Sequence, residues 1–273
     1  MDARRFLGLA PTHNDHRWYL PIVPGICTGH MFLFGGSGLG AAIEALEGTT
    51  GRPLIWATAQ YLSYANPPSI MDIDVTVPVT GKAITQARAV AHVADREILT
   101  VNAALGHRDL PASGAWPTPP DVPRPAECER RTMRFEVEDS INQRMETRLA
   151  LGRAMDELDG TPSDGRCALW GRIPELTEPS AASLAILGDF VPFGIGQALG
   201  ERAGGNSLDN TLRIARLVPT EWVLVDIRVD AVANGFGHGS VYLWAEDGTL
   251  MATASQSAIV RYWRDEAPPV RDR

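Results

Sequence analysis

Hydrophobic positions in the first part of the chain follow a helical period once and then a strand period several times. Leu39, Ile43 and Leu46 recur at the spacing of one helix face, which predicts a short helix. Four runs that alternate in polarity follow the helix, at residues 55–65, 73–79, 84–94 and 97–106. The pattern predicts one helix and then a sheet.

The same order returns in the second part of the chain. A helix carrying Leu184, Leu187 and Val191 is predicted to begin near Thr177, an N-cap placed just before Pro179. Strand-like runs follow it at residues 208–217, 222–232, 240–246 and 250–260, and two further extended runs precede it at 135–152 and 167–176.

A stretch rich in proline separates the two parts. Residues 110–125, LPASGAWPTPPDVPRP, carry six prolines, which remove backbone donors and exclude a helix interior. We therefore expect a first unit at residues 1–109, a linker at 110–130 and a second unit at 131–273.

A constant offset of 152 residues relates the two units. It pairs glycines, prolines and aspartates of the first unit with the same residue types in the second: Gly36 with Gly188, Pro67 with Pro219, Asp74 with Asp226, and Asp95 with Asp247. The strands are joined by turns too short for parallel crossovers, so the sheet must be antiparallel. The sequence thus predicts an α+β double hotdog fold, with two tandem units that each wrap an antiparallel sheet around a central helix.

The glycine-rich stretch 33–42, LFGGSGLGAA, does not fit two well-known functional loops. Its spacing is not GxGxxG, and Leu39 stands where a GxSxG nucleophile turn needs glycine. We interpret its glycines as allowing close packing of the helix. The backbone N–H groups at Gly35 and Gly36 are also candidates for polarising a substrate carbonyl.

Composition narrows the function classes. The 273 residues are 44% hydrophobic and 21% charged, with a formal net charge of −8, which disfavours nucleic acid as a partner. The three cysteines and six histidines show no ligand spacing, so neither a metal nor a disulfide framework is expected. We found no signal-peptide pattern and no run of 18 apolar residues. The expectation is a cytoplasmic protein without membrane insertion, and open sheet edges favour a homo-oligomer.

Three polar residues distinguish the second unit from the first. The helix holds a carboxylate among apolar neighbours, a strand opens with a hydroxyl, and the last strand carries an amide beside small residues: Asp189, Ser207 and Gln256. Shifted by 152, these positions become Ser37, Ile55 and Ala104. A carboxylate, a hydroxyl and an amide can together bind and orient a water molecule, so the second unit is predicted to carry the chemistry.

The order of these motifs resembles the type II acyl-CoA thioesterases. The resemblance is carried by LGDF at 187–190, SLD at 207–209 and ASQSAIVR at 254–261, together with FGG at 34–36. It implies an acyl-CoA substrate, no cofactor, and a hydrolytic water positioned by the three polar residues. It also implies that substrate contacts come from Gly35, Gly36, Ser37 and Asp209. The chain departs from the family at Asn210, where histidine is usual, and at residues 213–216, RIAR.

Two other functions and a second mechanism stay open at this point. A hotdog hydratase or dehydratase would need a His–Asp pair, and no histidine lies near Asp189 in the sequence. A non-catalytic acyl-CoA-binding protein is favoured by the departures at Asn210 and Ala215. Within the hydrolase hypothesis, Asp189 could also attack the thioester directly and form a mixed anhydride.

Overall fold

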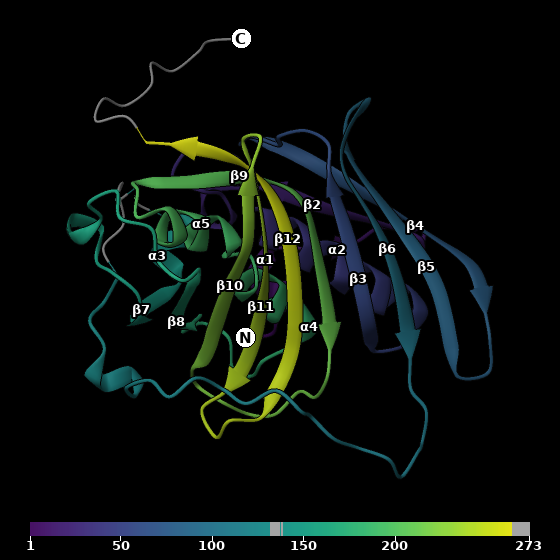
Figure 1. Ribbon diagram of the computed structural model, residues 1–273. Coiled ribbons are helices and arrows are strands. Elements are labelled where there is room, and N and C mark those ends of the chain that lie inside the picture. The colour runs from purple at the N-terminus through teal and green to yellow at the C-terminus, as the bar shows by residue number, and fades with distance from the viewer. Residues whose placement is uncertain (132–136, 138, 264–273) are drawn as a thin grey trace.

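The strands form one continuous sheet that curves around the helices (Figure 1). The computed structural model describes residues 1–131, 137 and 139–263. Within these residues the sheet has 12 strands in the order β1-β2-β4-β5-β6-β3-β9-β12-β11-β10-β8-β7. Every neighbouring pair is antiparallel, as the short turns predicted.

The strands divide evenly between the two parts of the chain. The strands of the first part are β1 (Ala10–Pro11), β2 (Arg17–Ile22), β3 (Leu54–Tyr61), β4 (Ser69–Thr80), β5 (Ile84–Val93) and β6 (Arg96–Gly106). Those of the second are β7 (Glu146–Leu151), β8 (Arg166–Arg172), β9 (Ala203–Ile214), β10 (Val223–Ala233), β11 (Phe236–Ala245) and β12 (Leu250–Tyr262). The helices are α1 (Ala3–Leu7), α2 (Gly35–Thr50), α3 (Ile141–Arg144), α4 (Ala181–Leu187) and α5 (Val191–Leu199), with 3-10 turns η1 (Pro24–Ile26), η2 (Pro125–Glu127) and η3 (Met155–Glu157).

The two parts join through β3 and β9 at the middle of the sheet. Thr58 pairs with Thr211 across this seam, and their hydroxyls lie 3.0 Å apart. Side chains on the inner faces of both strands therefore point into one shared interior, which brings residues of the first part close to residues of the second.

Strand register supports the internal repeat but changes its offset in part of the sheet. In β12, Gln256 pairs with Asn210 of β9, and in β6, Ala103 pairs with Ala57 of β3. Strand β12 therefore corresponds to β6, and β9 to β3, with an offset of 153 residues. For β12 the cause is the preceding turn, which is one residue longer than the turn before β6: Trp244 pairs with Leu250, whereas His92 pairs with Glu97.

The corrected offset changes two equivalences that the sequence predicted. Both β3 and β9 contain a bulge at matching places, at Ile55 and Leu208. Ser207 therefore corresponds to Leu54, not Ile55, and Gln256 corresponds to Ala103, not Ala104. The first unit still lacks both the hydroxyl and the amide.

Two element predictions were wrong. Within the extended run predicted at 135–152, residues Ile141–Arg144 form helix α3 and only Glu146–Leu151 is a strand; residues 135, 136 and 138 lie outside the described part of the chain. The second helix begins at Ala181 with Ser180 as its N-cap, whose Oγ accepts from Ser183 N at 3.1 Å. Thr177 lies in a bend before Pro179 instead, and the helix does not begin there because proline disfavours helical geometry in the residue before it, Glu178.

Helices α2 and α4 pack backbone to backbone. A Cβ added at Gly36 would lie 2.7 Å from Ile186 Cα, and one added at Gly40 would lie 3.0 Å from Ala182 O. Only glycine allows this approach. The prediction of close packing by the glycine-rich stretch is therefore explained by helix–helix contact.

The apolar segment Ala181–Leu199 is long and hydrophobic enough to cross a membrane by length and composition alone. In the structure, 78% of its most hydrophobic 18-residue stretch is buried inside the protein, and the segment is divided into the two helices α4 and α5. Its hydrophobicity is accounted for by the core that it fills.

The proline-rich segment lies against the outer face of the sheet as it runs from β6 to β7, along the lower edge of Figure 1. Trp170 Nε1 donates to Pro123 O at 2.9 Å. Val122 and Cys128 pack with Trp170, Trp222 and neighbouring apolar side chains in a second, smaller hydrophobic cluster. This segment thus stabilises β8 and β10 from outside.

Candidate active site

Asp189 lies at the interruption between α4 and α5. Pro192 is the second residue of α5 and has no N–H to bond the carbonyl four residues back, so an unbroken helix cannot pass through this point. Gly188 closes α4 by donating to Leu184 O at 2.8 Å. The break places a carboxylate inside the core, where a regular helix would bury apolar side chains.

Three donors surround the Asp189 carboxylate. Gly36 N donates to Oδ2 at 2.6 Å, Ser207 Oγ donates to Oδ1 at 3.3 Å, and Gln256 Nε2 also donates to Oδ1. The residue is only 6% exposed. Burial raises the pKa of Asp189 from 3.8 to about 6, and the hydrogen bonds from Gln256, Gly36 and Ser207 limit that rise.

Gln256 joins the other groups of the site. Its Nε2 donates both to Asp189 and to Ser207 Oγ, the latter at 2.7 Å. Its Oε1 accepts from Val191 N, the first N–H of α5, at 3.2 Å. The amide orientation is therefore set at both ends, and the structure brings the three predicted catalytic residues into one hydrogen-bonded cluster.

The three substrate contacts predicted in α2, namely Gly35, Gly36 and Ser37, have different surroundings. A Cβ at Gly35 would lie 2.7 Å from Asp189 Oδ2, so glycine at this position lets the carboxylate approach the backbone of α2. Gly36 N is already bonded to Asp189, so this N–H holds the carboxylate and is not free to polarise a carbonyl as the sequence suggested. Ser37 is fully buried, and its Oγ has no hydrogen-bond partner within the described residues.

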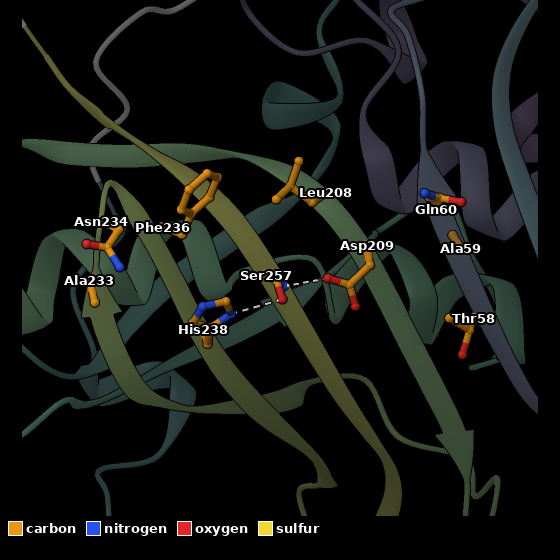
Figure 2. Close-up of a pocket in the computed structure, with 10 residues that line it drawn as sticks. All are labelled: Thr58, Ala59, Gln60, Leu208, Asp209, Ala233, Asn234, Phe236, His238 and Ser257. Atoms are coloured by element: carbon orange, nitrogen blue, oxygen red, sulfur yellow. Dashed lines mark hydrogen bonds between the residues drawn. The ribbon is translucent and has the colours of Figure 1, made fainter.

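Asp209 does not join the cluster. It follows the bulge at Leu208 and faces the outer side of the sheet, where its Oδ1 accepts from Ser257 N at 2.9 Å. Ser257 Oγ lies 3.0 Å from His238 Nδ1 (Figure 2). These side chains line an open groove of about 670 Å³ bordered by Thr58, Gln60 and Phe236. A substrate role for Asp209 stays a prediction, and it would belong to this outer groove.

Two inner-face residues next to the cluster were not predicted as site residues: Tyr61, and Asn210, which the sequence marked only as a departure from the family. Asn210 pairs with Gln256 across β9 and β12, and Tyr61 ends β3 beside it. Tyr61 Oη and Asn210 Nδ2 are buried and, apart from each other, have no hydrogen-bond partner in the described part of the chain. Such groups usually cost about 1–3 kcal/mol each. Strand alternation puts these residues on the inner face, but only the register across the seam shows that they approach Asp189.

The hydrogen bonds of Asp189 bear on the competing hydratase hypothesis. Its partners are a backbone N–H, a hydroxyl and an amide, and none of them is a histidine. Among the residues that the structure describes, no group of three or more His, Cys, Asp or Glu side chains could hold a metal ion. The chemistry available at Asp189 is thus that of a buried carboxylate with a raised pKa and two neutral neighbours.

Comparisons with known proteins identify the fold and the family. The model of the acyl-CoA thioesterase C-terminal domain matches residues 118–260, more than half of the chain. A proposed thioesterase from Novosphingobium aromaticivorans DSM 12444 is 32% identical, with 91% of this chain and 96% of the other covered and a TM-score of 0.81. No curated protein sequence matches.

Two further structures share the fold at lower identity. The TesB protein of Mycobacterium avium subsp. paratuberculosis is 16% identical, with 96% and 98% of the chains covered and a TM-score of 0.77. The acyl-CoA thioesterase II TesB2 of Mycobacterium marinum is 17% identical, with 95% and 98% covered and a TM-score of 0.75. The fold is therefore a double hotdog, as predicted. The domain match and the 32% identity to the Novosphingobium protein show that the chain belongs to the acyl-CoA thioesterase family.

Proposed function

We propose that this protein hydrolyses acyl-CoA thioesters to a free acid and CoA with a water molecule activated by Asp189. The observation that carries the proposal is the carboxylate itself: it is buried, its pKa is raised to about 6, and it is held by donors from α2, β9 and β12. A base with a pKa near the working pH is the most effective proton acceptor.

The reaction needs one proton acceptor that later returns the proton. Asp189 takes a proton from water as the water oxygen bonds to the carbonyl carbon. The tetrahedral intermediate then collapses, the C–S bond breaks, and the proton passes to the CoA sulfur. Ser207 and Gln256 orient the carboxylate and the water through their hydroxyl and amide.

Thiol release from a panel of acyl-CoAs tests this proposal. The panel spans short, long, branched and aromatic acyl groups, and a thiol-reactive dye measures free CoA while chromatography measures the acid. Equal amounts of both products are expected. Hydrated acyl-CoA without free thiol would instead identify a hydratase, and saturable binding without either product would identify an acyl-CoA-binding protein; both results overturn the proposal.

The rate should depend on pH through Asp189. Because the ionised carboxylate is the active form and its pKa is raised to about 6, kcat/KM is expected to rise with pH and reach half its plateau near that value. Initial rates from about pH 5 to about pH 7.5 measure this rise, which is the acidic limb of the pH–rate profile. Circular dichroism at each pH shows whether the fold persists. A rate that is constant over this range, or that rises toward acid, contradicts the assignment of the base.

Ser207→Ala removes one donor to Asp189 and one acceptor for Gln256. We expect kcat to fall about 10- to 100-fold with little change in KM. Since the Ser207 bond lowers the pKa of Asp189, its loss should also move the acidic limb to higher pH.

Ser257→Ala is the matched control, because Ser257 lies one residue after Gln256 on the outer face of the same strand. It should leave kcat and the acidic limb unchanged. Equal losses in both variants would show that the effect of Ser207 does not arise at Asp189.

A further inference from the structure

Two buried polar groups at the inner face of the sheet have no partner beyond each other. Asn210 is 1% exposed, and apart from the Tyr61 phenol beside it, its Nδ2 has no hydrogen-bond partner among the described residues. Tyr61 Oη likewise has no partner there apart from the Asn210 side chain. A buried donor left unpaired is costly in a folded protein, so its presence calls for an explanation in terms of function.

Both groups lie beside the candidate active site. Asn210 pairs with Gln256 on one side and with Ala59 of β3 on the other. Tyr61 is two residues beyond Ala59, so its side chain points to the same inner face. A Cβ at Gly35 would lie 3.2 Å from Tyr61 Oη and 2.7 Å from Asp189 Oδ2. The phenol and the carboxylate thus approach the same point, and the absence of a side chain at Gly35 lets both lie close to the backbone of α2.

The phenol is held in its neutral, donating form. Burial raises the pKa of Tyr61 well above its ordinary value, and the charges of Asp189 and Asp209 raise it further, while the neighbouring Asn210 amide opposes the rise. Tyr61 therefore keeps its O–H proton at neutral pH, where Asp189 is ionised. Asn210 Nδ2 supplies N–H donors at every pH.

The thioester reaction needs hydrogen-bond donors for the carbonyl oxygen. Negative charge develops on the carbonyl oxygen as water attacks, and preorganised donors aimed at that oxygen lower the barrier. Gly36 N, the donor expected from the sequence, is bonded to the Asp189 carboxylate instead. The two unpaired groups lie next to that carboxylate and both can donate.

We propose that Tyr61 and Asn210 form the donor pair that binds the carbonyl oxygen of the acyl thioester and stabilises the oxyanion. This inference rests on the proposed hydrolase function. It makes the site a product of both parts of the chain: β3 of the first unit contributes Tyr61, and the second unit contributes Asn210 with the base.

Kinetics of Tyr61→Phe and Asn210→Leu test the proposal, because the first removes only the hydroxyl and the second replaces the amide by an apolar side chain with the same branching. We expect kcat to fall about 10²- to 10³-fold for Tyr61→Phe, with KM changed less than about threefold and the acidic limb still governed by Asp189. The melting temperature should stay the same or rise, since an unpaired buried hydroxyl is removed. Tyr64→Phe is the matched control: Tyr64 is 49% exposed, its hydroxyl accepts from Asn206 Nδ2, and its loss should leave kcat unchanged.

A bound carbonyl reports the same contact without turnover. The probe is a non-hydrolysable acyl-CoA ketone in which a methylene separates a ¹³C-labelled carbonyl from the sulfur. Its infrared stretch should lie at lower frequency on the wild-type protein than in water, and return toward the water value on Tyr61→Phe and Asn210→Leu.

The outcomes separate the two proposals. If wild-type protein releases thiol and Asp189 is required, but Tyr61→Phe changes neither kcat nor the carbonyl frequency, the donor pair is wrong and the hydrolase stands. If kcat falls together with the melting temperature while the frequency is unchanged, the role of Tyr61 is structural. If neither thiol release nor binding of the ketone occurs with wild-type protein, both proposals fail.

Discussion

Asp189→Asn is expected to reduce kcat for acyl-CoA hydrolysis by about 10³-fold or more, because it removes the only ionisable group of the cluster while keeping its shape. The amide cannot accept the proton that water must lose, and its NH₂ meets donors where the carboxylate accepted them. Thiol release under saturating substrate measures the loss. Turnover within about tenfold of the wild-type rate would exclude Asp189 as the base.

Asp226→Asn serves as the control for this variant. Asp226 is another buried carboxylate of the second unit, 3% exposed and paired with Arg228 at 3.2 Å, and it does not contact the cluster. Its loss should change stability but leave kcat per folded molecule unchanged. A comparable fall in kcat for both variants would indicate that any buried charge of this unit is needed for folding, not catalysis.

The Asp189→Asn protein should also show what the buried carboxylate does to stability. The folded pKa of about 6 lies above the unfolded value of 3.8, so between these values the folded state keeps a proton that the unfolded state has lost. Asp189 therefore destabilises the protein progressively as pH rises through this window. Relative to Asp189→Asn, wild-type protein should lose about 3 kcal/mol of unfolding free energy between about pH 4 and about pH 7. Urea unfolding of both proteins at each pH measures the difference; parallel curves would mean that the pKa is not raised.

Gly36→Ala is expected to be the most damaging single methyl addition in the helix pair. The new Cβ would lie 2.7 Å from Ile186 Cα and 2.8 Å from Ala185 O, which are backbone atoms that cannot turn aside. Helices α2 and α4 must separate, and overpacking of this kind costs about 1–3 kcal/mol or more. The shift would also pull Gly36 N away from Asp189, so kcat should fall even in the fraction that remains folded. Thermal unfolding and thiol release on the same samples measure both effects.

Gly40→Ala is the comparison variant with a milder clash, because its Cβ would lie 3.0 Å from Ala182 O and 3.6 Å from the next atoms. A smaller loss of stability is expected, with nearly normal kcat because Gly40 does not contact the carboxylate. If Gly36→Ala is no worse than Gly40→Ala in either measurement, the contact at Gly36 does not limit the approach of the helices.

Much of the fold could be read from the chain because strand and helix periods are local signals. The runs at 73–79 and 84–94 became β4 and β5, and the run at 250–260 became β12, since alternating apolar positions favour a sheet with one buried face. The prediction of one helix carrying Leu184, Leu187 and Val191 was wrong, because the apolar period continues through Pro192 while the helix itself is interrupted there. Strand β2 was missed, since its exposed–buried alternation at Arg17–Ile22 includes Pro21 and lies in a polar context.

The sequence by itself determined which residue types are available and where they lie along each strand: a carboxylate at Asp189, a hydroxyl at Ser207, an amide at Gln256, and glycines where helices must meet. Only the tertiary structure decided which atoms face one another. A single extra residue before β12 moved the equivalence of the two copies by one position, and the seam between β3 and β9 brought Tyr61 and Asn210 to the carboxylate. The physical reason is the distance along the chain over which each kind of interaction acts. Periodicity and turn chemistry act between near neighbours, whereas the Gly36 N–H, the Asp189 carboxylate and the Gln256 amide meet across more than 200 residues of chain through packing and hydrogen bonds that form only when the core closes.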